Sequence, residues 1–284
     1  MLDYEKQRKL VILFMIGVVL VVIFLIVSLI VIWTPEPEKE LEYQVGVVEN
    51  ISVKEQDMIQ RYYTKISEMF IKQDFESIFS LIGEDYLSFN EYNKDDVKKY
   101  LNQKSVFGKR LELVDSKTYM VDGYSNVYYL DFKVANEIYS LNVVVREKSP
   151  ENYTIAFDKF IDYKEDVYND TINSIGLNIY EQIRYTNSVE YRFKLTNHYS
   201  NEVTINNNSL ANAVLLVGTQ AVSRVPIMTT LATTKVKLKF GDRRNFTAVF
   251  PIKDELDYIS YRNLVLKDVV YSGLQGTTDI EYTI

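Results

Sequence analysis

The chain has 284 residues, of which 47% are hydrophobic and 25% are charged, a balance typical of folded proteins and unlike that of disordered ones. Its net charge of −7 argues against a nucleic-acid partner, because a polyanion normally binds a basic face. The lack of cysteine excludes disulfides, thiolate metal sites and thiol nucleophiles.

The N-terminal part carries the features of a single-pass membrane anchor. Residues 10–33, from Leu10 to Trp33, contain no charged side chain. A helix of this length measures ~36 Å, against ~30 Å for the hydrocarbon core of a bilayer. Residues 1–9 carry a small excess of basic side chains, and basic flanks usually stay in the cytoplasm. The sequence therefore predicts a cytoplasmic tail, a transmembrane helix at 10–33 and an extracytoplasmic remainder.

Helical periodicity begins after a polar linker at residues 34–51. Ser52 and Glu55 form a capping-box pattern, which predicts the start of a long amphipathic helix. A second helix is expected to end at Gly83, because glycine is common just past a helix end. The apolar residues of the three predicted helices are Ile59, Tyr62, Tyr63, Ile66, Met69 and Phe70; Phe75, Ile78, Phe79 and Ile82; and Val97, Tyr100 and Leu101.

Beyond Gly108 the apolar period changes to two, which indicates strands with one buried face. The predicted strands cover residues 111–120, 128–134, 139–145 and 153–157. Asp122 and Gly123 mark a hairpin turn, and Arg146 is expected to point outward. Three helices and a four-stranded meander predict an α+β domain at residues 52–161.

This order of elements resembles the cone-shaped fold of nuclear transport factor two and the ketosteroid isomerases, in which a curved sheet wraps a long helix. The resemblance implies a small-molecule cavity or a protein-interaction module. An anchor followed by such a cone is also similar to the assembly factors of conjugative type IV secretion systems. That similarity implies a role that needs no active site.

Residues 162–171 are polar and acidic and indicate a connector before a second domain at 172–284. Short alternating stretches separated by turn signals are typical of a β-sandwich. The clearest of them lie at residues 189–196, 236–240, 246–250 and 264–266. The stretches 191–197 and 239–242 resemble immunoglobulin-like and telokin-like domains of Gram-positive surface proteins. The predicted fold class is thus α+β plus all-β, behind an N-terminal transmembrane helix.

No residue pattern predicts a catalytic, cofactor-binding or metal site. His198, the only histidine, falls in a Ser- and Asn-rich turn, where we expect it to be exposed. The acidic pairs Glu84–Asp85 and Asp95–Asp96 are adjacent in sequence, so they suit helix N-termini better than convergence on a substrate.

Two sets of side chains allow either a structural or a functional interpretation. Lys235, Lys237 and Lys239 share one strand face, and a protected sheet edge is a commoner reason for this pattern than a contact for anionic polymers. The tyrosines Tyr62, Tyr63, Tyr128 and Tyr129 are expected near the cone, where filling of the core is commoner than a ligand cavity.

These features favour a non-catalytic function, because catalysis at neutral pH usually needs a tuned acid, base, nucleophile or metal. The sequence predicts a membrane-anchored, extracytoplasmic scaffold or assembly factor of a bacterial envelope machine for secretion, conjugation or cell-wall synthesis and division. Its expected partners are other envelope proteins, with homo-oligomers as a further option and no cofactor. The alternatives are a sensor or carrier that binds a small molecule or wall polymer in the cone, and an enzyme.

Overall fold

Strands dominate the folded part of the chain. The computed structural model describes residues 53–135, 139–149, 151–205, 213–218, 222–231, 235–253 and 262–284. Within these ranges 53% of the residues lie in strands and 20% in four helices. The fold-class prediction, an α+β cone and a sandwich behind a transmembrane helix, is therefore wrong, because the sequence patterns overlooked much of the strand content.

The predictions for the N-terminal part fall on residues that the structure does not describe. The tail at 1–9, the transmembrane segment at 10–33 and the linker at 34–51 lie outside the described residues. Among the residues that the structure describes, no helix combines the length and the apolar character that a bilayer crossing requires.

The first long helix is confirmed. Helix α2 (Val53–Ile71) buries Ile59, Tyr62, Ile66 and Phe70 along one face, as their helical spacing predicts. The proposed cap residue Ser52 lies outside the described residues. These four side chains belong to a hydrophobic core that α2 shares with the other helices and with the strands that follow them.

The expected glycine end of the second helix is wrong. Helix α3 (Phe75–Leu81) stops at Ile82, which is extended and forms a parallel bridge with Ile155. Gly83 has a φ of −67° and is the N-cap of a further helix, α4 (Glu84–Phe89), which the sequence did not predict. The backbone N–H of Gly83 donates to the carbonyl oxygen of Ile155 at 3.1 Å. Helix α3 therefore ends because the residues after it pair with the strand that contains Ile155.

Helix α5 (Lys94–Gln103) corresponds to the third predicted helix. Asn93 is its N-cap and accepts hydrogen bonds from the backbone N–H groups of Asp95 and Asp96. The Asp96 carboxylate accepts in turn from the Asn93 N–H at 3.1 Å, which completes a capping box. Val97 and Leu101 are buried.

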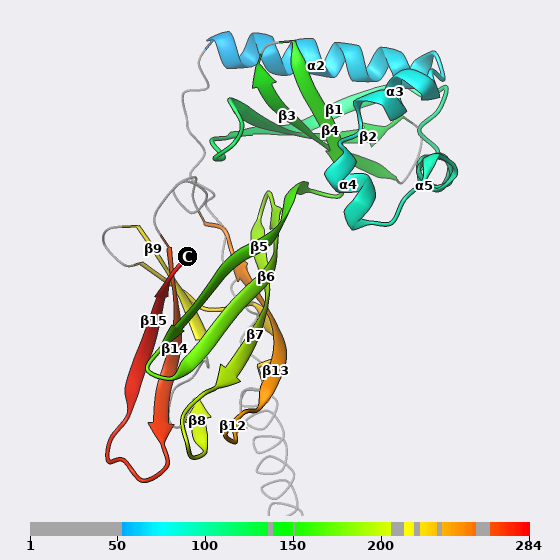
Figure 1. The fold of residues 1–284 in the computed structure, drawn as a ribbon. Helices are drawn as coiled ribbons and strands as arrows, with labels where there is room; N and C mark the ends of the chain where they lie inside the picture. The colour runs from blue at the N-terminus through cyan, green and yellow to red at the C-terminus, as the bar shows by residue number, and fades with distance from the viewer. Residues whose placement is uncertain are drawn as a thin grey trace, which may run out of the picture. The chain divides into compact units, whose positions relative to one another are not determined.

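The predicted meander is present as a four-stranded antiparallel sheet (Figure 1). Its strands in order are β1 (Leu111–Tyr119), β2 (Asn126–Val134), β3 (Ser140–Ser149) and β4 (Asn152–Phe157). The turn after β1 contains Gly123 at a φ of +90°, which glycine adopts without strain. Tyr128, Leu130 and Phe132 of β2 belong to the same core as α2.

The middle of this sheet is buried on both faces, which differs from the predicted half-buried strands. Val143, Val144 and Val145 are consecutive and all 0% exposed. Val144 belongs with Val127 to a second core, which also contains the residues of the later strands. An unbroken apolar run is the pattern of a strand covered on both sides.

The predicted connector at 162–171 is instead part of a long strand, β5 (Phe160–Ile172). It pairs antiparallel with β6 (Ile175–Tyr185) through a tight turn at Asn173 and Ser174, whose φ values are 48° and 64°. Two positive φ values are typical of a type I′ hairpin turn.

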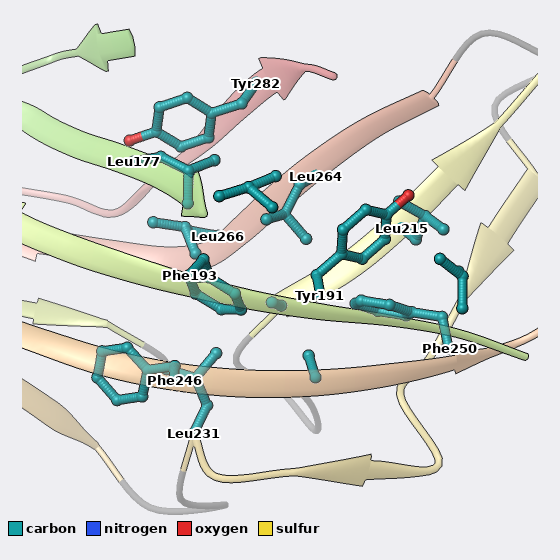
Figure 2. Packing of buried hydrophobic residues seen from close by; sticks show 14 of the residues in the cluster. Leu177, Tyr191, Phe193, Leu215, Leu231, Phe246, Phe250, Leu264, Leu266 and Tyr282 are labelled. Carbon is teal, nitrogen blue, oxygen red and sulfur yellow. The ribbon is translucent and has the colours of Figure 1, made fainter. Parts of the chain in front are cut away.

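The later strands form two further sheets. One has the order β11 (Met228–Thr229), β13 (Arg243–Pro251), β7 (Ser188–Asn197), β6, β5. The other has the order β10 (Val222–Arg224), β9 (Ala213–Val217), β14 (Arg262–Tyr271), β8 (Val203–Ile205), β12 (Val236–Leu238), with β15 (Thr278–Thr283) also paired to β14. Figure 2 shows side chains of both sheets packed together, among them Tyr191, Phe193 and Leu264.

The strand predictions in this region are partly confirmed. The alternating stretches at 189–196 and 246–250 lie in β7 and β13, but β12 ends at Leu238 and leaves Phe240 66% exposed in the following turn. Contacts between Cα atoms group the described residues, from Val53 to Ile284, into one compact unit. Separate folding of 52–161 and 172–284 stays a prediction.

Candidate functional site

The residues singled out from the sequence do not gather into one site. His198 is exposed in the turn after β7, and its backbone N–H donates to the carbonyl oxygen of Ser174 at 2.8 Å. Asp95 and Asp96 lie at the start of α5, as their helix-terminal interpretation requires. Within the described ranges, no three His, Cys, Asp or Glu side chains are grouped so that they could hold a metal ion.

The three lysines lie on the last strand of a sheet. Lys235, Lys237 and Lys239 are exposed in or next to β12, which among the described strands pairs with β8 alone. Lys237 forms an exposed ion pair with Glu202 at 3.1 Å. Lysine on an unpaired strand edge discourages pairing with other chains, and this placement suits that role.

Two of the four tyrosines surround a buried carboxylate. Glu147 on β3 is 3% exposed and accepts hydrogen bonds from the Tyr62 hydroxyl at 2.8 Å and the Tyr128 hydroxyl at 3.5 Å. The side-chain N–H of Asn126 donates to the same carboxylate at 3.2 Å. Tyr129 lies in the other core, because neighbouring strand residues face opposite sides. The sequence predicted the tyrosines near this core but not the carboxylate.

Replacing Glu147 with glutamine is expected to lower the pKa of Tyr128 from about 12 toward its ordinary value of 10.0. Burial is the largest cause of the raised pKa and the Glu147 charge comes next, so the value should fall only in part. Tyrosinate absorbance, compared with and without Tyr128→Phe, isolates this hydroxyl. Tyr163, whose pKa burial and Glu165 raise to about 12, is the control and should not change.

The sign of the pH dependence follows from the raised value. A tyrosine whose folded pKa exceeds its unfolded pKa adds stability that is fully present below pH 10.0 and is lost as the pH rises through about 12. An unchanged Tyr128 titration in the Glu147→Gln chain would contradict the assigned cause.

Buried arginines join the helices and the meander to the later strands. Arg146 on β3 is 1% exposed and donates to the Asp85 carboxylate of α4 at 2.6 Å and to the carbonyl oxygen of Ile161 at 2.7 Å. Gly83 lies against its guanidinium, where a Cβ would approach the Nη2 atom to 1.7 Å. Asp85 is therefore the partner of a buried cation and not only a solvated helix-terminal charge.

A second buried arginine binds two carboxylates. Arg184 on β6 is 1% exposed, and its Nε atom donates to Asp162 of β5 at 2.7 Å. It also pairs with Asp122 in the β1–β2 turn, which Lys164 contacts at 3.1 Å. Burial alone would raise the pKa of Asp122, but the charges and hydrogen bonds of Arg184 and Lys164 lower it.

This network of buried arginines and carboxylates is only weakly indicated by the sequence. Arg146 and Asp162 occupy positions that alternate with apolar neighbours, so a period of two places them in solvent. The run Val143 to Val145 before Arg146 was the available indication that both faces of β3 are covered. The partners are separated by tens of residues in the chain, and strand patterns alone do not pair them.

Exposed apolar side chains gather on one segment, residues 222–228, which we call the apolar segment. Val222, Val225, Ile227 and Met228 are 45%, 55%, 61% and 58% exposed. The segment includes β10 and the start of β11, which are the end strands of the two sheets. Its backbone is fixed, since the Ile227 N–H donates to the Val249 carbonyl oxygen at 2.8 Å. Clustered exposed apolar residues mark interaction surfaces more often than scattered ones do.

Comparison with known proteins gives no family. No protein-family model matches the chain, and a search of curated proteins finds no match.

Proposed function

We propose that the chain is a non-catalytic scaffold or assembly factor of a bacterial envelope machine, one for secretion, conjugation or cell-wall synthesis and division. It acts by binding another envelope protein through the apolar segment. The observation that carries it is the exposure of four apolar side chains within seven residues.

The composition of the apolar segment favours a protein partner over a lipid surface. Helices and loops that lie on membranes usually combine apolar residues with exposed Lys, Arg or Trp. The only cation of the segment, Arg224, is 7% exposed, and its other polar residue is Ser223. Val, Ile and Met side chains on a fixed backbone instead suit an apolar surface of another protein, where hot spots are desolvated.

The buried ionisable groups support a structural rather than a chemical role. Arg146 and Arg184 are committed to carboxylates and backbone oxygens, and Glu147 is committed to tyrosine hydroxyls. A catalytic acid or base has to reach a substrate, which these enclosed groups do not. They instead fix the positions of strands from distant parts of the sequence.

The proposed location follows from the sequence. The apolar, charge-free residues 10–33 with a basic flank would place the folded part outside the cytoplasm, close to the membrane surface. Tethering raises the effective concentration of the protein toward other membrane proteins, so a modest contact area is enough.

Ile227→Asp is expected to reduce recovery of the partner at least about tenfold, which corresponds to a loss of ~1.4 kcal/mol of binding free energy. A charge at the centre of a desolvated contact is unpaired in the complex but solvated in the free chain. The measurement is quantitative mass spectrometry of proteins crosslinked to the tagged full-length chain in its own membrane.

Val114→Asp is the matched control. Val114 is an apolar residue that is 65% exposed on β1, so the same charge is introduced outside the apolar segment. Both variants should keep the circular dichroism spectrum of the unchanged chain, because both side chains are exposed. Equal recovery of every partner by the Ile227→Asp and Val114→Asp chains would contradict the proposal.

A further inference from the structure

A groove of about 350 Å³ lies where three turns meet, and we call it the end groove. It is formed by the β5–β6 turn, the turn after β7, and β14 with the loop that leads into β15. The residues that line it include Asn173, Ser174, Tyr199, Tyr271, Gln275 and Thr277. The volume falls at the lower end of the ~300–1,000 Å³ range of small-molecule sites.

The walls of the end groove are held by contacts within the protein. The Tyr271 hydroxyl donates to the carbonyl oxygen of Asn173 at 2.5 Å, and its ring meets that of Tyr199 edge to face with 5.0 Å between centroids. Asn197 is 0% exposed and its side-chain oxygen accepts from the Tyr199 N–H at 2.8 Å. A site that is formed before binding loses less entropy when a ligand arrives.

The polar groups of the end groove are neutral and available. None of its ten lining residues, all within the described ranges, is charged. The side chains of Asn173, Ser174, Gln275 and Thr277 make no hydrogen bond with the part of the chain that the structure describes. Amides and hydroxyls both donate and accept hydrogen bonds, which matches a ligand whose groups also do both.

The apolar part of the lining is aromatic and flat. Tyr199 is half-buried, and an aromatic ring face carries negative charge density that attracts polarised C–H groups. Leu274 adds an apolar rim and is 60% exposed. An ionic ligand would find no counter-charge among these residues, whereas a sugar ring combines an apolar C–H face with hydroxyls at its edge.

We propose that the end groove, lined by Tyr199, Tyr271 and uncharged amide and hydroxyl side chains, binds a neutral carbohydrate chain. The Tyr199 ring packs against the C–H face of one sugar ring. Asn173, Ser174, Gln275 and Thr277 hydrogen-bond its hydroxyls. This inference goes beyond the proposed protein-binding function and does not depend on the apolar segment.

Saturation-transfer NMR on the full-length chain tests the proposal, with cellotetraose, maltotetraose and tetra-N-acetylchitotetraose as probes. The chain is kept in a zwitterionic detergent, because detergents with sugar headgroups would compete. At least one oligosaccharide should receive saturation, strongest at the C–H protons of one ring. Tyr199→Ala is expected to weaken its binding at least about tenfold.

Two further variants keep the test decisive. Gln275→Ala changes an exposed loop residue, so it should weaken binding without disturbing the tyrosine pair. Phe240→Ala removes an exposed side chain that does not line the end groove and should leave binding unchanged. The inference is overturned if none of the three oligosaccharides receives saturation, or if binding survives both Tyr199→Ala and Gln275→Ala at full strength.

Discussion

Arg184→Met is expected to destabilise the folded chain by about 3–5 kcal/mol, because it leaves a buried carboxylate without its partner. Asp162 is 5% exposed and receives two hydrogen bonds from Arg184. Methionine replaces the length of the arginine side chain but none of its donors, so the cost comes mainly from the unpaired charge. Urea unfolding followed by circular dichroism measures the change, since the only tryptophan, Trp33, lies outside the described residues.

Arg192→Met is the matched control for this loss. Arg192 is 37% exposed and pairs with Glu181 and Glu190, so solvent already screens its charges. We expect a loss below about 1 kcal/mol. Adding Asp162→Leu to Arg184→Met should restore part of the stability, because the unpaired charge is removed as well. Equal losses for the two single arginine variants would show that burial of the Arg184 pair is unimportant.

Gly83→Ala should cost about 3 kcal/mol, the upper end of the ~1–3 kcal/mol that overpacking usually costs. The added methyl would lie 1.7 Å from Arg146 Nη2 and 2.5 Å from Asp85 Oδ1. A long side chain can normally move away, but Arg146 is 1% exposed and is held by the Ile161 carbonyl oxygen. The same unfolding measurement gives the change.

Gly176→Ala separates crowding from the general effect of replacing glycine. A Cβ there would approach His198 Nε2 to 3.1 Å, and His198 is exposed and free to move away. Neither glycine has a positive φ, so backbone strain does not differ between them. We expect a change within about 1 kcal/mol for Gly176→Ala. A Gly83→Ala loss no larger than this would contradict the close packing around Arg146.

Sequence patterns succeeded where a single buried face decided the structure. The predicted first helix matches α2, because apolar side chains at a period of 3.6 need one apolar surface to pack on. The predicted meander matches the order of β1 to β4, although its middle is buried on both faces. The acidic pair Asp95–Asp96 lies in the first turn of α5, as its helix-terminal interpretation predicts, and local preferences of this kind depend on few distant contacts.

The patterns failed where tertiary pairing decided the structure. Helix α4 has six residues and one buried side chain, Tyr86, too few to establish a period. Strand β5 is acidic and partly exposed, yet Asp162 is buried because Arg184 lies opposite on β6. A buried charge is stable only when its oppositely charged partner is buried beside it. Neither residue of such a pair can therefore be recognised as buried from its own stretch of sequence.

The proposed interaction surface was equally unpredictable from the sequence. Val225 and Ile227 are residue types that are common in hydrophobic cores. They are exposed because the apolar segment lies at the end strands of two sheets. The end groove combines turns that lie roughly a hundred residues apart in the chain, such as those containing Asn173 and Gln275. A linear pattern contains no information on which turns share one end of two sheets.

Photo-crosslinking in the native membrane tests the central proposal most directly. A photoreactive amino acid placed at position 227 of the full-length chain should yield one dominant crosslinked protein, and Val225→Asp in the same chain should abolish it. The same amino acid at position 114, which lies on β1 outside the apolar segment and is similarly exposed, should not yield that product. Identical products from positions 227 and 114, or none from position 227, would contradict a function that depends on the apolar segment.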